Sequence, residues 1–350
     1  MVLPAACVGT AGETAAATSF VRLARSTSEQ AAEPILGVAG VAATSRSVLV
    51  LDLARPGLTV LDPNDLRALA VRGVEGRGPG EFQAAFNPHR DARWTWLAAT
   101  GDSVVAFDGN RLGRFGAEGQ FQGLWQDQPH LPEGLTDFTS RIVVTGTTLW
   151  YDNGDYAEPR RADQRVPYLT VRRWDGRHLD TAFSLELTQP PRGPRGSFVG
   201  TGQAVPLWDV SPEGCVVASN GGDLDLWFVA GGGMAAVRSL PTDVADAIPF
   251  AEELATPVVA GMRRVPDPSR RKRWAAVRFD GEGNVWLLSA AFSRVREGRV
   301  VVRYHPGADA AEIDTVPAWP RAFASGRGWY GVFANDDGTF RVERWQAAAH

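Results

Sequence analysis

The chain has 350 residues, which is enough for two average domains or for one large all-β domain. Its 44% hydrophobic and 22% charged residues are typical of a folded globular protein rather than of a disordered chain. The formal net charge of -4 argues against a nucleic-acid-binding protein, and no apolar run approaches the ~18 residues of a transmembrane helix.

Residues 1–18 are expected to be a signal remnant or a flexible tether. Leu3-Pro-Ala-Ala-Cys7 resembles the end of a bacterial lipoprotein signal, where small residues precede the cysteine that is lipidated. No charged segment or apolar core precedes it, so either the start is trimmed or the match is chance. We expect the protein to be periplasmic or extracellular. In one alternative it is lipid-anchored through Cys7. Cys215 is expected to be a small buried apolar residue, with a Cys7–Cys215 disulfide left open.

A strand-like apolar run recurs six times along the chain, about 44 to 69 residues apart. Further strand-like runs and turn residues flank each copy, so that each can be the second strand of a four-stranded unit. A period in this range, built from strands alone, is typical of propeller blades. The six copies are residues 47–52, 103–108, 148–152, 215–220, 284–289 and 328–334.

The sixth unit lacks a fourth strand before the chain ends. Residues 19–25, ahead of the first unit, form a spare strand with alternating apolar positions. We expect this strand to pair with the sixth unit, which removes an exposed sheet edge. The predicted fold is therefore one all-β domain over residues 19–346, a six-bladed β-propeller of four-stranded blades closed by the N-terminal strand, with residues 347–350 as a tail.

The loop between the first two units contains four glycines and a proline within residues 73–80. Its segment Gly76-Arg-Gly-Pro-Gly-Glu-Phe82 is similar to the join between NHL repeats. The chain thus resembles the six-bladed β-propellers of the NHL and TolB-like group. The resemblance implies a binding or scaffolding surface, although some six-bladed relatives are hydrolases or lactonases.

Loop lengths indicate which face binds. The connections expected on one face are short, whereas every long connection is expected on the other. A small molecule, a glycan or a protein is expected to bind on the long-loop face. Its connections are residues 73–90, 126–137, 152–165, 186–205, 241–273 and 289–298.

The ends of the second strands are expected at the channel mouth on that face. Carboxylates and amides there could bind Ca²⁺, which takes several oxygen ligands, and lactonase-like relatives do place a metal there. Alternatively, the same side chains cap the next turn through hydrogen bonds to backbone amides. The residues are Asp52, Asp108, Asp152 and Asn220, with Asn153 as a further ligand contact.

Three other residues are candidate ligand contacts. Arg160 and Arg264 belong to arginine clusters in the long loops and suit an acidic ligand or glycan, with solvated salt bridges as the alternative. Trp208 could stack on a sugar or aromatic ligand, with core packing as the alternative.

Catalytic motifs are absent: neither a Gly-x-Ser-x-Gly elbow nor a P-loop occurs, and His89 and His130 are possible bases without an evident partner. The sequence therefore favours a non-catalytic recognition module. A metal-dependent lactonase- or esterase-like hydrolase at the channel mouth is the alternative.

Overall fold

A computed structural model gives the fold of the protein. It describes residues 20–25, 34–82, 96–127, 130–136, 139–152, 165–188, 207–230, 233–251, 272–291, 299–308, 310–323 and 328–347. The chain forms two compact units, which are described separately. The closing unit comprises Thr14–Asp155, Val171–Thr181 and Val316–His350, and the second unit comprises Met1–Glu13, Tyr156–Thr170 and Ala182–Thr315.

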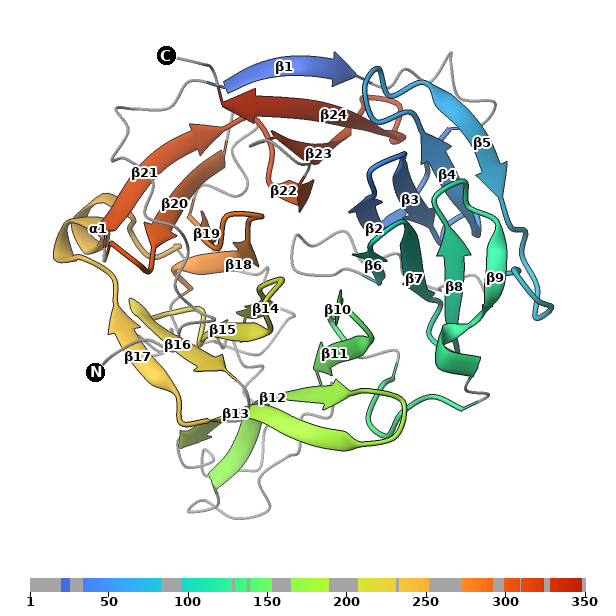
Figure 1. The fold of residues 1–350 in the computed structure, drawn as a ribbon. Helices are drawn as coiled ribbons and strands as arrows, with labels where there is room; N and C mark the ends of the chain where they lie inside the picture. Colours follow the sequence, from blue (N-terminus) through green and yellow to red (C-terminus); the bar gives the residue numbers. More distant parts are fainter. Residues whose placement is uncertain are drawn as a thin grey trace, which may run out of the picture. The chain divides into compact units, whose positions relative to one another are not determined.

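The described residues form six antiparallel sheets of four strands each (Figure 1). This confirms the all-β, six-bladed β-propeller fold. In chain order, the first three sheets are β2 (Val38–Ala43), β3 (Val48–Asp52), β4 (Gly57–Leu61) and β5 (Ala68–Arg72); β6 (Leu97–Thr100), β7 (Ser103–Phe107), β8 (Leu112–Gly116) and β9 (Phe121–Leu124); and β10 (Ile142–Thr145), β11 (Thr148–Asp152), β12 (Arg165–Trp174) and β13 (Leu179–Thr188).

The remaining sheets follow the same scheme, except that the last one takes its outer strand from the start of the chain. They are β14 (Leu207–Val210), β15 (Cys215–Ser219), β16 (Asp225–Ala230) and β17 (Ala236–Ser239); β18 (Trp274–Phe279), β19 (Val285–Ser289), β20 (Arg299–His305) and β21 (Ala310–Val316); and β22 (Pro320–Phe323), β23 (Gly328–Ala334), β24 (Phe340–Ala347) and β1 (Phe20–Arg25).

Closure by the N-terminal strand is confirmed. Strand β1 lies antiparallel beside β24, with Arg25 opposite Glu343 (Figure 1). The Glu343 carboxylate is buried and pairs with three arginines, at 2.8 Å from Nε of Arg341, 3.6 Å from Nη1 of Arg22 and 3.8 Å from Nε of Arg25. Two of these arginines belong to β1, so the carboxylate ties the closing strand to its sheet.

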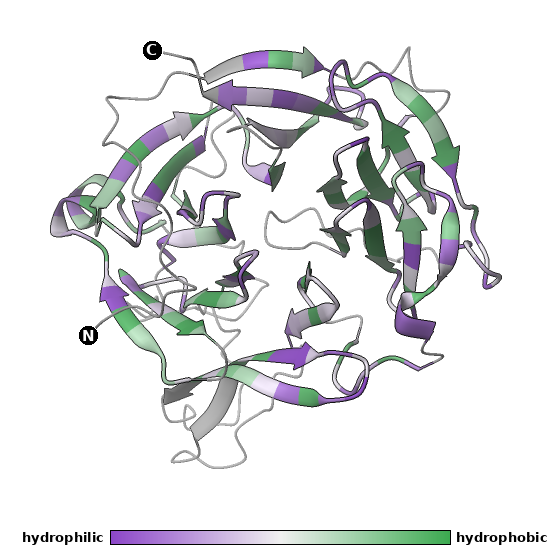
Figure 2. Cartoon of the chain, viewed as in Figure 1, coloured by the Kyte–Doolittle hydropathy of each residue, from purple (hydrophilic) through white to green (hydrophobic). Residues whose placement is uncertain are grey.

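The second strands are buried on both faces, which is why they read as continuous apolar runs. Every residue of β3 is buried, and so is every residue of β15. Figure 2 shows β3 and β7 almost entirely green, whereas β24 carries long purple segments. The apolar core of the closing unit lies between such strands, around Leu49, Val105 and Leu149.

Helix α1 spans Thr242–Ala247 and directly follows Pro241. Proline is tolerated at the start of a helix, where its missing N–H costs nothing. The helix ends where Nη1 of Arg273 donates to the carbonyls of Ala245 at 3.0 Å and Ile248 at 2.7 Å.

Among the described residues, no helix is long and apolar enough to cross a membrane.

Cys215 is fully buried, as expected, but it is disulfide-bonded rather than a free apolar residue. The chain's other cysteine, Cys7, lies outside the described residues. The predicted boundaries of the tether and the tail stay predictions.

Candidate functional site

Asp52 ends strand β3, and its buried carboxylate is fully used by the backbone. It accepts hydrogen bonds from four amides, those of Leu36 at 2.6 Å, Gly37 at 3.0 Å, Ala54 at 2.9 Å and Arg55 at 3.1 Å. Burial raises the pKa of Asp52, while these hydrogen bonds act in the opposite direction. The side chain therefore caps the turn after β3 and fixes the backbone that enters β2.

Asp152, at the end of β11, likewise holds the segment that enters the first strand of its sheet. It accepts the backbone amides of Ser140 at 2.9 Å and Arg141 at 3.0 Å and the Ser140 hydroxyl at 2.6 Å. Burial raises its pKa as well, against the opposite effect of the hydrogen bonds. The carboxylate thus joins the second strand of this sheet to the segment that leads into the first strand, β10.

The other two strand ends also cap turns. Asp108 accepts the amides of Asn110 and Arg111, both at 3.0 Å, and Asn220 accepts those of Gly222 and Asp223, both at 2.9 Å. Within the described ranges, no group of three or more His, Cys, Asp or Glu side chains lies close enough to hold a metal ion. The hydrogen bonds of Asp52, Asp108 and Asn220 are those of the capping alternative, whereas the described donors to Asp152 lie in the segment before β10. A calcium site stays a prediction without support from these contacts.

Of the remaining predicted ligand contacts, Trp208 lies among the described residues and the other three do not. Asn153, Arg160 and Arg264 lie outside the described residues. Trp208 lies in β14 and is buried, as the packing alternative expects. Its neighbour Asp209, which the sequence did not single out, accepts the amide of Phe279 at 2.7 Å and so connects β14 with β18.

The glycine-rich loop surrounds the side chain of Arg111, which follows Asp108 by three residues. Nη1 donates to the carbonyls of Arg77 and Gly78, each at 2.8 Å, and Nη2 donates to those of Gly76, at 3.4 Å, and Glu81. Nε donates to the Asp108 carboxylate at 3.1 Å. A guanidinium has five N–H groups, so Arg111 has none left for a ligand.

The loop needs its glycines to reach this arginine. Gly73 and Gly80 have φ values of 79° and 74°, which side-chain-bearing residues rarely adopt. A Cβ atom on Gly80 would lie 2.9 Å from Cβ of Phe121. The loop ends at Phe82, whose ring stacks on Phe115 with centroids 5.2 Å apart. The sequence predicted the loop, but not that its carbonyls bind Arg111.

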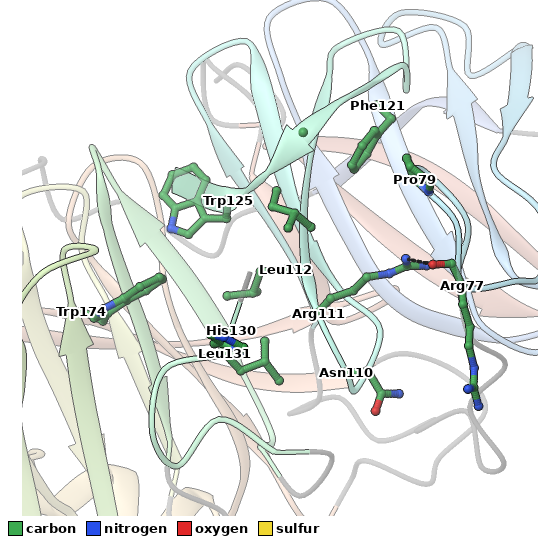
Figure 3. A pocket seen from close by; sticks show the side chains of 12 residues that line it. Arg77, Pro79, Asn110, Arg111, Leu112, Phe121, Trp125, His130, Leu131 and Trp174 are labelled. Atoms are coloured by element: carbon green, nitrogen blue, oxygen red, sulfur yellow. Dashed lines mark hydrogen bonds between the residues drawn. The ribbon is translucent and has the colours of Figure 1, made fainter. Parts of the chain in front are cut away.

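A cavity of about 460 Å³ lies beside this loop (Figure 3). Its walls come from the loop, from β8 and β9, from the 3-10 turn at Trp125–Asp127, and from the end of β12. Its volume is within the range of small-molecule pockets. The lining residues are Arg77, Pro79, Asn110, Arg111, Leu112, Phe121, Gly123, Leu124, Trp125, His130, Leu131 and Trp174.

The pocket is apolar and aromatic with a cationic edge. Seven of its lining residues are leucine, phenylalanine, tryptophan or proline, and none is aspartate or glutamate. Arg111 is neutralised by Asp108, whereas the guanidinium of Arg77 has no ion pair with any residue in the described part of the chain. The sequence had marked His130 as a possible base and none of the lining residues as a ligand contact, because isolated tryptophans and leucines in strand-rich sequence look like core positions.

No known protein family and no curated protein matches the sequence. Solved structures match over nearly the whole chain. A candidate exported protein from Bacteroides fragilis has 12% identity and a TM-score of 0.52, over 95% of both chains. A member of the DUF4221 family from Bacteroides vulgatus has 9% identity and a TM-score of 0.54, over 95% of this chain and 98% of the other. At such identities the similarity establishes the fold, a divergent six-bladed β-propeller, and no activity.

Proposed function

We propose that this protein is a non-catalytic recognition module that binds a small molecule in the pocket beside the Gly76–Glu81 loop. The observation that carries the proposal is the lining: an apolar and aromatic cavity of ligand size with a few polar groups at one edge. Two of its walls come from connections that the sequence predicted as long binding loops. Arg77 and Pro79 belong to residues 73–90, and His130 and Leu131 belong to residues 126–137.

The wall formed by the loop is held in place before any ligand arrives. Four loop carbonyls bind one guanidinium, and the Gly78 amide donates to the Glu81 carboxylate at 2.5 Å. A preformed wall does not have to be ordered on binding, which lowers the entropic cost of association. This rigidity favours a recognition site over a surface that assembles around a partner.

The hydrolase alternative gains less support. Asp52, Asp108 and Asp152 use their carboxylates for backbone amides, and a catalytic carboxylate needs an oxygen available to substrate or water. A lactonase- or esterase-like activity therefore stays a prediction of the sequence, and we do not propose it.

The disulfide of Cys215 supports a periplasmic or extracellular location, because disulfides persist in oxidising compartments. A thiol reagent applied to the unfolded, unreduced protein is expected to find no free thiol, and two after reduction. Two free thiols before reduction would contradict this location. Lipid anchoring through Cys7 stays a prediction.

Binding is tested by thermal shift and calorimetry with neutral, anionic and cationic aromatic fragments. Leu131→Trp, which fills the pocket, is expected to abolish binding. Leu69→Trp is the matched control, because Leu69 is exposed on β5 and does not line the pocket, and this variant should bind like the wild type. The proposal fails if no fragment binds, or if Leu131→Trp binds as well as Leu69→Trp.

A further inference from the structure

The two ends of the pocket differ in chemistry. Trp125 and Trp174 lie together at one end, and Arg77 and Pro79 lie at the other (Figure 3). Both tryptophans are largely buried, at 6% and 8% exposed, so they offer fixed ring surfaces rather than mobile ones. Indole surfaces favour planar rings through stacking or edge contacts. This end therefore suits a flat apolar group.

The other end carries the cation of Arg77, whose backbone is held and whose side chain has no ion pair among the described residues. The carbonyl of Arg77 is held by Nη1 of Arg111 at 2.8 Å, so the backbone that bears the side chain is fixed. The Arg77 guanidinium has no ion pair within the described part of the chain, and the residue is exposed. An arginine with free donors in fork geometry binds a carboxylate through two parallel hydrogen bonds.

Among the described residues, neither Asp108, Glu81 nor Asp127 forms an ion pair with Arg77. Asp108 pairs with Arg111 at 3.1 Å, and the Glu81 carboxylate accepts the Gly78 amide at 2.5 Å. Asp127 belongs to the tryptophan end, where its Oδ1 is 3.9 Å from the position of a Cβ on Gly123. Asp108 and Arg111 thus neutralise each other, the Glu81 carboxylate keeps its charge beside Gly78, and Asp127 adds a negative charge near the tryptophans.

From this arrangement, and resting on the proposed function, we infer the class of ligand. It is a small organic acid with a planar apolar ring, whose ring lies against Trp125 and Trp174 and whose carboxylate pairs with Arg77. Arg111 is a positioning residue, because it holds the Arg77 backbone without offering a donor of its own.

Three compounds with one ring and different charge test the inference: indole-3-acetate, its neutral amide and the cationic tryptamine. The full-length protein is titrated with each by calorimetry, up to several millimolar. The acetate is expected to bind about threefold to tenfold more tightly than the amide, and tryptamine most weakly. Raising the salt concentration should weaken the acetate alone.

Substitutions test the arginine end and the tryptophan end of the pocket separately. Arg77→Ala should reduce the affinity for the acetate to that for the amide, while Arg114→Ala, an exposed arginine on β8 outside the lining, should change nothing. Trp174→Ala should weaken all three compounds, and Leu131→Trp replaces it if that variant does not fold. If the three compounds bind with equal affinity and Leu131→Trp abolishes their binding, the preference for an acid is refuted, whereas the binding pocket is supported. Tightest binding of tryptamine, or no effect of Arg77→Ala, would also overturn the inference. If none of the three binds while another fragment does, the ligand class is wrong; if nothing binds at all, the proposed function fails with it.

Discussion

Nη1 of Arg111 donates to the carbonyl of Arg77 at 2.8 Å, although 34 residues separate the two in the chain. This bond joins the turn after β7 to the loop between β5 and β6, so it connects the first two blades. The same side chain pairs with the Asp108 carboxylate at 3.1 Å. One arginine therefore couples a blade junction to the wall of the pocket, which makes it the first position to test.

Arg111→Ala should destabilise the protein by about 2–4 kcal/mol, because it removes the charged partner of the buried Asp108 carboxylate and the side-chain donors to four loop carbonyls. Arg111→Lys should recover only part of this loss, since an ammonium cannot reproduce the fork. Urea unfolding measures the effect. The control is Arg114→Ala on the neighbouring strand β8, which should change the free energy of unfolding by less than ~0.5 kcal/mol. Equal midpoints for the two alanine variants would contradict this role for Arg111.

Gly80→Ala tests why the loop needs glycine where it packs against Phe121. The new methyl group must tolerate a φ of 74° and also lie 2.9 Å from Cβ of Phe121. Gly101→Ala introduces the backbone strain without a steric contact, because Gly101 has a φ of 57° and no atom lies within 4 Å of the added Cβ. We expect a loss of about 1 kcal/mol for Gly101→Ala and a clearly larger loss for Gly80→Ala. Comparable unfolding midpoints would show that the contact with Phe121 relaxes without cost.

The blades could be predicted from the sequence because burial leaves a residue pattern. Strands such as β3 and β15 are covered on both faces, so every position is apolar up to the polar residue that ends the strand. The closing strand could be predicted because the sixth unit was one strand short. Both predictions rest on buried side chains, and a buried position can be recognised in the sequence because its residue is apolar.

The site left no comparable pattern because its key partners are backbone groups. The donors to Asp52 are amides, and the acceptors of Arg111 are carbonyls; any residue type supplies both. A carboxylate that caps a turn and one that binds calcium look identical in sequence, and only the fold shows which partners are near. The pocket likewise depends on Trp174 meeting residues of a different blade.

Glu343→Gln should loosen the closing strand. The substitution removes the charge that Arg22, Arg25 and Arg341 share and leaves a neutral amide in a buried position. A loss of about 1–3 kcal/mol is expected, together with faster hydrogen exchange in residues 20–25. Glu118→Gln is the control, because Glu118 pairs with Arg46 on the surface, where both side chains are more than half exposed. Unchanged exchange in residues 20–25 would show that backbone pairing alone holds β1.

Two aspartates with similar hydrogen bonds are predicted to have opposite pH dependence. Burial raises the pKa of Asp152 above 3.8, although Ser140 and Arg141 donate to it. Asp175 is exposed, and hydrogen bonds from the amides of His178 and Arg177 lower its pKa to about 2. Burial therefore decides the sign, since amide donors are common to both.

The native state holds the Asp152 proton more tightly than the unfolded chain does, so the contribution of Asp152 to the free energy of unfolding falls as pH rises through its raised pKa. The contribution of Asp175 is present above its unfolded pKa and is lost as pH falls toward 2. The stability difference between wild type and Asp152→Asn should therefore be largest at low pH, and that between wild type and Asp175→Asn largest at neutral pH. Denaturant unfolding at several pH values measures both differences. If the Asp152 difference grew toward neutral pH instead, its hydrogen bonds would outweigh its burial, and the carboxylate would be charged in the folded protein well below pH 4.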